Sequence, residues 1–292
     1  MKILSLLVLI FAALLPAEAA IRIVTSLPDL ADLTRQIGGD KVSVDYIVRA
    51  DQNPHFVEVK PSYMMKLKSA DLFLTIGMDL ELWGPQIVDG SRNDKLVVVD
   101  LSKDIHKLEV PSHVDASLGD VHRYGNPHYW LDPRNMHKLA NEIIDALTGV
   151  SPSDAQTFRA NADAYLKKLD AKITSWQAMM KPYAGAQIIT FHKSWSYFAG
   201  WLGLTVADQI EPKPGIAPSP SHTAELISLI RKSGIKVIVV EPFYDLSAPE
   251  QIARNTGAKV LVLPTSCGGE DGPKDYIGLM DYNVNALANA LK

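Results

Sequence analysis

The segment AQTFRANADAYLKKLDAKITSWQAMM, residues 155–180, lies near the middle of the chain and predicts one long, uninterrupted helix. Its apolar residues recur at three- and four-residue spacings, at Phe158, Ala162, Tyr165, Leu169, Ile173 and Trp176. This spacing places them on one face of a helix, so a single stripe is buried along the whole length. At 1.5 Å per residue the helix would be about 38 Å long. We therefore expect a stiff helical connection between two parts of the molecule.

On both sides of this helix, short β-branched runs alternate with longer amphipathic runs, which is typical of βα units around a parallel sheet. Before the helix we predict strands at 21–25, 42–48, 72–76 and 96–99, and helices at 27–37, 61–68, 79–88 and 135–147. After it we predict strands at 187–191, 205–210, 237–240 and 259–263, and helices at 194–202, 223–233, 249–256 and 274–291.

The predicted fold is therefore α/β, with two lobes that each have a mainly parallel sheet flanked by helices. The N-terminal lobe would occupy residues 20–150 and the C-terminal lobe residues 182–292, with the backbone helix over 151–181 linking them. A chain of 292 residues, 47% hydrophobic and 21% charged, is long enough for a core in each lobe.

The first 19 residues have the pattern of a removable secretion signal. Lys2 gives an early positive charge, an apolar run follows over 3–15, and Ala17-Glu18-Ala19 resembles a small-residue cleavage site. We expect cleavage near Ala19 and a periplasmic mature protein. No later stretch approaches the ~20 apolar residues of a membrane-spanning helix, so we do not expect the protein to span a membrane.

Charge and cysteine content narrow the class of protein further. The formal net charge of −4, from 29 basic and 33 acidic residues, gives no basic surface for nucleic acid. The single cysteine, Cys267, excludes an internal disulfide and leaves no cysteine at the cleavage site for a lipid anchor. We expect a monomer.

Two copies of Asn-Pro-His, at 53–55 and 126–128, are the most distinctive local pattern in the chain. Proline fixes its own φ and keeps the preceding residue out of the α region, so each histidine should follow a stiff, extended segment. A third histidine, His192, follows the predicted strand at 187–191, and Glu241 follows 237–240. In parallel α/β lobes, ligands bind beyond the carboxyl ends of strands, where we place His55, His128, His192 and Glu241.

Three neutral imidazoles and one carboxylate or water form a tetrahedral shell that suits Zn²⁺ and also accepts other first-row divalent ions. His55 and His128 would come from the first lobe, and His192 and Glu241 from the second. Each histidine alone would more commonly be a core or surface residue, but the repeated motif favours a shared role. We therefore predict a metal site in the cleft between the lobes.

Several segments resemble those of the zinc- and manganese-binding solute receptors of bacterial ABC importers. DQNPHFVE at 51–58, NPHYWLDP at 126–133 and HKSWSYF at 192–198 are similar to the family's first, second and third ligand segments. Val240-Glu241-Pro242 and the segment 282–287 match later landmarks of the family, so the resemblance spans nearly the whole mature chain. It implies two α/β lobes joined by one long helix, one metal ion between them, and delivery of that ion to a membrane permease.

The chain departs from this family in the loop after the last strand, where the family usually supplies an aspartate or glutamate ligand. Here the loop reads LPTSCGG at 263–269 and contains no carboxylate. Glu241, Glu270, Asp271, Cys267 or water could take the fourth position. We favour Glu241 because it ends a strand on the cleft side, whereas Glu270 and Asp271 lie in a glycine-rich turn.

The leading functional hypothesis is a periplasmic receptor, not an enzyme, that captures a divalent transition metal and delivers it to an ABC permease. Zinc is favoured over manganese because the third ligand is a histidine and the family's usual carboxylate is missing, and Mn²⁺ prefers carboxylate oxygen to imidazole. The alternative is a zinc-dependent hydrolase in which three histidines hold the ion and Glu241 acts as general base on a bound water. An adhesin or a receptor for an organic chelate has no residue pattern of its own here.

The polar segment at 101–125 is longer than an ordinary loop and carries His106, His113 and His122. These histidines fit either a solvated surface loop or a weak outer trap that raises the local metal concentration. Deletion of 104–119 with unchanged metal uptake at limiting concentration would exclude the trap.

Overall fold

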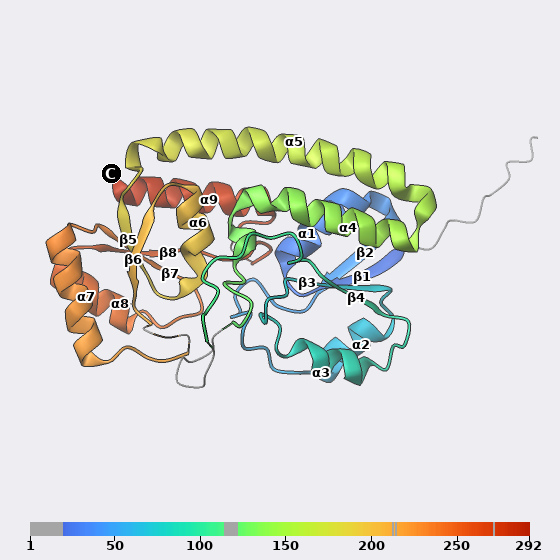
Figure 1. The fold of residues 1–292 in the computed structure, drawn as a ribbon, viewed down its shortest axis with the longest axis horizontal. Helices are drawn as coiled ribbons and strands as arrows, with labels where there is room; N and C mark the ends of the chain where they lie inside the picture. The colour runs from blue at the N-terminus through green and yellow to red at the C-terminus, as the bar shows by residue number, and fades with distance from the viewer. Residues whose placement is uncertain (1–19, 114–121, 212, 214, 271) are drawn as a thin grey trace, which may run out of the picture.

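The computed structural model describes residues 20–113, 122–211, 213, 215–270 and 272–292. Within them, two four-stranded parallel sheets lie side by side and one long helix runs across both (Figure 1). The predicted secretion signal and Asp271 lie outside the described residues. None of the helices in the described part of the chain is both long enough and apolar enough to cross a membrane.

The first sheet contains β1 (Ile21–Thr25), β2 (Val42–Tyr46), β3 (Leu72–Thr75) and β4 (Val97–Asp100), in the order β2-β1-β3-β4. Figure 1 shows α1 (Pro28–Gly38) and α4 (Met136–Val150) on one side of it, and α2 (Pro61–Lys68) and α3 (Gly84–Ser91) on the other. β3 is buried at every position because helices cover both faces, which is why it reads as a continuous apolar run rather than an alternating one.

The second sheet repeats this strand order with β5 (Gln187–Thr190), β6 (Thr205–Gln209), β7 (Val237–Val240) and β8 (Lys259–Val262), arranged β6-β5-β7-β8. Alternate residues of β7 enter different cores. Ile238 and Val240 pack with α7 (Pro220–Ser233) and α8 (Ser247–Thr256), whereas Val237 and Val239 join the larger core that includes α6 (Ser196–Trp201) and α9 (Tyr276–Leu291). The two-lobed α/β prediction is confirmed.

The long helix α5 (Ala155–Met180) lies along both lobes (Figure 1). Its buried residues include the whole predicted stripe, Phe158, Ala162, Tyr165, Leu169, Ile173 and Trp176. Near its N-terminal end Asn161 donates to the carbonyl of Ile37 in α1 at 2.9 Å. Near its C-terminal end Lys172 and Trp176 both donate to Asp281 of α9, at 2.6 and 2.7 Å. The helix is therefore fixed to an element of each lobe by side-chain hydrogen bonds as well as by its apolar stripe.

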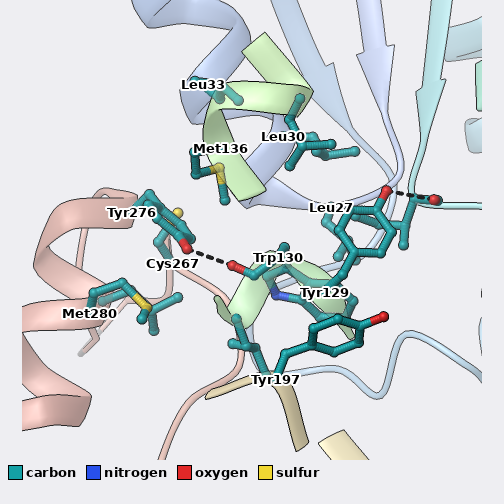
Figure 2. Packing of buried hydrophobic residues seen from close by; sticks show 14 of the residues in the cluster. Leu27, Leu30, Leu33, Tyr129, Trp130, Met136, Tyr197, Cys267, Tyr276 and Met280 are labelled. Carbon is teal, nitrogen blue, oxygen red and sulfur yellow. Dashed lines mark hydrogen bonds between the residues drawn. The ribbon is translucent and has the colours of Figure 1, made fainter. Parts of the chain in front are cut away.

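The loop before α9 also joins the lobes, as Figure 2 shows around Trp130 and Tyr276. The Trp130 indole donates to the carbonyl of Thr265 at 2.8 Å, and the Tyr276 hydroxyl donates to the carbonyl of Trp130 at 2.5 Å. The backbone N–H of Cys267 donates to Asp29 of α1 at 3.1 Å. One buried apolar cluster runs through this joint from the first sheet to α9. The lobes are thus connected by packed side chains as well as by α5.

Two predicted helix starts differ from the structure by three residues or more. α3 begins at Gly84 rather than at 79, because Gly77, Met78 and Asp79 have positive φ angles of 78°, 52° and 62°. The Glu81 carboxylate accepts from the backbone N–H groups of residues 76 and 77 and so holds this left-handed run. α7 begins at Pro220, three residues before its predicted start at 223, because Ser219 caps it by accepting from the backbone N–H of His222 at 3.2 Å.

Candidate metal centre

Three of the four predicted site residues converge. The imidazoles of His55, His128 and His192 each offer a ring nitrogen, and these nitrogens all lie within 4.8 Å of one another. The ring centroids are 5.0, 5.2 and 5.4 Å apart. Imidazoles arranged tetrahedrally around one ion, with nitrogens about 2.0 Å from it, would have centroids about 5 Å apart. The spacing of the three rings therefore fits a single shared ion.

Only one of these histidines lies within two residues of a strand end. His192 follows β5 directly, but His55 lies well beyond the end of β2 and His128 far beyond β4. The backbone at His128 is not extended. Its φ and ψ are −80° and 33°, and residues 129–131 form a 3₁₀ turn. Long loops rather than strand ends bring these two rings to the centre. All three rings nevertheless come from connections that leave the carboxyl ends of strands β2, β4 and β5, as the rule for parallel α/β lobes expects.

Both Asn-Pro-His motifs form a turn in which the asparagine side chain caps the histidine. The side-chain oxygen of Asn53 accepts from the backbone N–H of His55 at 3.0 Å, and the side-chain oxygen of Asn126 accepts from the backbone N–H of His128 at 3.0 Å. An asparagine side chain commonly bonds the backbone two residues on in this way. The conformation is thus set by the asparagine together with the proline, and not by the proline alone as expected from the sequence.

Hydrogen bonds select the nitrogen that two of the rings present. His128 Nδ1 lies 2.9 Å from the Asn126 side-chain oxygen, and His192 Nδ1 lies 2.5 Å from a carboxylate oxygen of Glu211. Both partner oxygens are acceptors, so each Nδ1 carries the proton and each Nε2 is left with a lone pair. Glu211 was missed from the sequence. It follows β6 in a proline-rich connection, and an acidic residue just beyond a strand was the only local signal.

The close approach of two rings also has a consequence for the metal-free protein. His55 Nε2 and His128 Nε2 are 3.0 Å apart, and His128 Nε2 is the acceptor, so His55 Nε2 carries the proton there. Burial, reinforced by neighbouring imidazoles, holds the pKa of His55 and of His128 well below the usual range. Both rings are therefore neutral at pH 7, and an ion that binds both through Nε2 must replace the proton on His55 Nε2.

Glu241 is fully buried at the end of β7 but is not a member of the mutually close group of nitrogens. Neither of its oxygens has a hydrogen-bond partner of standard geometry among the described residues. Burial raises the pKa of this carboxyl, and the nearby His192 and Ser194 offset part of the shift. A buried carboxylate without a partner is costly, so this group is suited to a cation.

Two other candidates for a fourth ligand, Cys267 and Glu270, do not belong to the group of mutually close nitrogens. Cys267 is buried against Asp29 in the joint between the lobes, and burial raises the pKa of its thiol, which disfavours the thiolate form needed by a metal. Glu270 is exposed in the loop before α9. Asp271 is outside the described residues.

The polar segment supplies an unexpected neighbour of the centre. The His122 ring lies 4.9 Å from that of His55 and 6.4 Å from that of His128, measured between centroids. The next residue, Arg123, makes a two-pronged ion pair with Asp79, at 2.9 and 3.1 Å, which fixes this end of the segment to the first lobe. His106 and His113 are exposed. The metal-trap hypothesis for this segment stays a prediction.

Comparison with known proteins agrees with this geometry. The family model described as "Zinc-uptake complex component A periplasmic", or ZnuA, matches residues 23–290. The chain belongs to the ZnuA family. A crystal structure of ZnuA matches with a TM-score of 0.80 and 24% identity over 94% of this chain and 100% of that one, which supports the shared fold. Members of the family are solute-binding proteins and not enzymes, so the hydrolase alternative has no support.

Curated relatives of this ZnuA family member are named for two different metals. The zinc-binding lipoprotein AdcA of Streptococcus pneumoniae is 28% identical over 280 residues, covering 93% of this chain and 56% of AdcA. The manganese-binding lipoprotein MntA of Halalkalibacterium halodurans is 27% identical over 277 residues, covering 93% of this chain and 88% of MntA. The chain therefore spans about half the length of AdcA and most of the length of MntA.

Proposed function

We propose that this chain captures a divalent transition metal ion, with zinc favoured and manganese second, and delivers it to the membrane permease of an ABC importer. His55, His128 and His192 would bind the ion through one ring nitrogen each. The observation that carries this proposal is the convergence of their three ring nitrogens within 4.8 Å. Family membership supports the transport role, because ZnuA proteins are solute-binding components of importers.

Glu241 is proposed as the fourth ligand. A dipositive ion among three neutral imidazoles needs a counter-charge in a buried site, and Glu241 is a fully buried carboxylate beside His192. Its two oxygens have no hydrogen-bond partner of standard geometry in the described structure, so coordination would satisfy a group that is otherwise unpaired.

Zinc is preferred over manganese on the chemistry of this ligand set. Three imidazoles and one carboxylate match the four-coordinate shells that zinc adopts, whereas Mn²⁺ prefers oxygen ligands in larger shells. The relatives named for zinc and for manganese both lie within the same family, so the names alone leave both metals as candidates.

The proposed setting is the bacterial periplasm, after cleavage of a secretion signal near Ala19. Two relatives are named as lipoproteins, which supports export. We propose an unanchored monomer here. The permease would recognise the loaded form, because metal ligands from both lobes join the two halves of the molecule around one ion.

Elemental analysis of the purified mature protein tests the ligand assignment. We expect about one zinc ion per chain, and loss of that zinc in His55→Ala, His128→Ala, His192→Ala and Glu241→Ala. His137→Ala is a matched control, because His137 lies on the surface of α4, where its ring contacts Asp170 at 2.8 Å. Full zinc loading in two or more of the histidine variants would contradict the assignment. Tighter binding of Mn²⁺ than of Zn²⁺ in calorimetry would reverse the preferred metal.

A further inference from the structure

The two Asn-Pro-His motifs have the same sequence but different contacts. In the first, Asn53 accepts from the backbone of His55, and its amide nitrogen lies 3.5 Å from the Tyr244 hydroxyl, at the limit of a hydrogen bond. In the second, Asn126 is buried, and its oxygen accepts from both the backbone N–H and the ring Nδ1–H of His128. The surroundings of Asn126, rather than the motif, create this additional contact.

The amide nitrogen of Asn126 fixes the side chain in this orientation. It donates to the backbone carbonyl of Lys193 at 2.8 Å and faces a carboxylate oxygen of Glu109 at 3.3 Å. Both of these partners are acceptors, so the amide oxygen must face the other way, toward His128. All four contacts of the amide are consistent with only one of its two orientations.

Lys193 belongs to the second lobe and directly follows His192, so the Asn126 amide also connects the segments that carry two of the imidazoles. Neighbouring contacts support the same junction. The Glu109 carboxylate accepts from the Ser196 hydroxyl at 2.6 Å, and the Tyr197 hydroxyl accepts from the backbone N–H of Leu108 at 3.1 Å. Three segments therefore meet around the buried amide of Asn126: the start of α6, residues 108–109 and the second Asn-Pro-His motif.

We propose that Asn126 is a positioning residue for metal capture, which holds His128 in the Nδ1–H tautomer and fixes this ring relative to the segment that carries His192. The expected effect of Asn126 on metal affinity rests on the proposed function. Its effect on the tautomer of His128 does not, because that tautomer is a property of the metal-free protein. Groups behind a histidine ligand that set its tautomer typically change metal affinity about 10–100-fold when they are removed.

The test compares Asn126→Ala with Asn53→Ala, which removes the same turn in the other motif but leaves the contact between Asn126 and the His128 ring intact. We expect Asn126→Ala to weaken zinc binding about 10-fold or more, measured by competition with a chromophoric chelator, and Asn53→Ala to weaken it less. Nitrogen-15 spectra of the metal-free imidazoles, assigned with His128→Ala, should show loss of the Nδ1–H form of His128 only in Asn126→Ala. The signals of His192 should shift in the same variant.

A second variant keeps the inference testable if Asn126→Ala does not fold. Asn126→Asp retains an acceptor for the His128 ring but loses the donor to Lys193, so we expect the Nδ1–H form to persist while the His192 signals shift. Equal weakening by Asn53→Ala and Asn126→Ala, or an unchanged His128 tautomer in Asn126→Ala, would overturn the inference. If wild-type protein binds no zinc, the proposed function fails, and the spectra of the metal-free variants still decide the role of Asn126.

Discussion

Each of the two most buried imidazoles has a polar side chain behind it that selects the nitrogen facing the centre. His128 has the amide of Asn126 and His192 has the carboxylate of Glu211. Sequence patterns identified the three histidines, because the repeated Asn-Pro-His and the resemblance to metal receptors are local in the chain. They did not identify Glu211 as the partner of His192, because 19 residues separate the two. Such contacts depend on how β5 and β6 pair.

Replacement of Glu211 by glutamine is expected to weaken zinc binding about 10-fold or more. The glutamine side chain could still accept from Nδ1 of His192, but it would lack the negative charge that makes the ring a better electron donor. Calorimetric titration with zinc measures the change. Glu225→Gln is the control, because the Glu225 side chain is 73% exposed on α7. Unchanged affinity in Glu211→Gln would show that the carboxylate orients the ring without tuning it.

At the level of elements, the hydrophobic periodicity was sufficient to place most helices and strands. The bounds of α2, α5 and β7 were predicted to the residue, because a proline, a long apolar stripe and a β-branched run mark them. α3 was predicted too early, because three consecutive left-handed residues precede it and Glu81 stabilises them by side-chain contacts. Periodicity does not report such contacts. The convergence of His55 and His128 was predicted from the repeated motif and the strand-end rule, but the long loops that bring the two rings together could not be predicted from periodicity.

The link between α5 and α9 predicts a measurable loss of stability on one substitution. Asp281→Ala removes the acceptor of Trp176 Nε1 at 2.7 Å and leaves a buried indole N–H unpaired, at a cost of about 1–3 kcal/mol. Asp281→Asn keeps an acceptor for the indole and should cost less. Urea denaturation of the metal-free protein measures both changes. Asp163→Ala, on the exposed face of α5, should have little effect, and a loss as large as that of Asp281→Ala would contradict the assigned role.

At the level of the whole molecule, the two lobes are held together by α5 and by the loop before α9, and the proposed ligands of one ion come from both sides. The hydrogen bonds of Trp130, Thr265 and Tyr276 cross this boundary close to the centre, since the Trp130 ring lies 5.3 Å from that of His128. Relative motion of the lobes would have to break these buried contacts. The sequence predicted the helix as the only link, because the crossing contacts join residues far apart in the chain.

The boundary also contains a titratable group that links stability to pH. Burial raises the pKa of Asp29 to about 7 from its usual value of 3.8, while its oxygen accepts from the backbone N–H of Cys267. The folded protein therefore keeps a proton that the unfolded chain releases above about pH 4, so the contribution of Asp29 to stability is lost as the pH rises from about 4 to about 7. Asp29→Asn resembles the protonated form and should remove this loss.

We expect the free energy of unfolding of Asp29→Asn to be close to that of wild type at about pH 4.5, and higher than that of wild type at about pH 8, in metal-free protein. The difference between the two proteins isolates Asp29, because the other groups titrate in both. Glu81, whose pKa is also raised to about 7, makes stability fall with rising pH as Asp29 does. The depressed pKa values of His55 and His128 make stability rise with pH below pH 6.5. Urea denaturation at both pH values measures the difference. A gap between the variant and wild type that does not change with pH would mean that Asp29 is ionised throughout, and that the lobes meet around a carboxylate rather than a carboxylic acid.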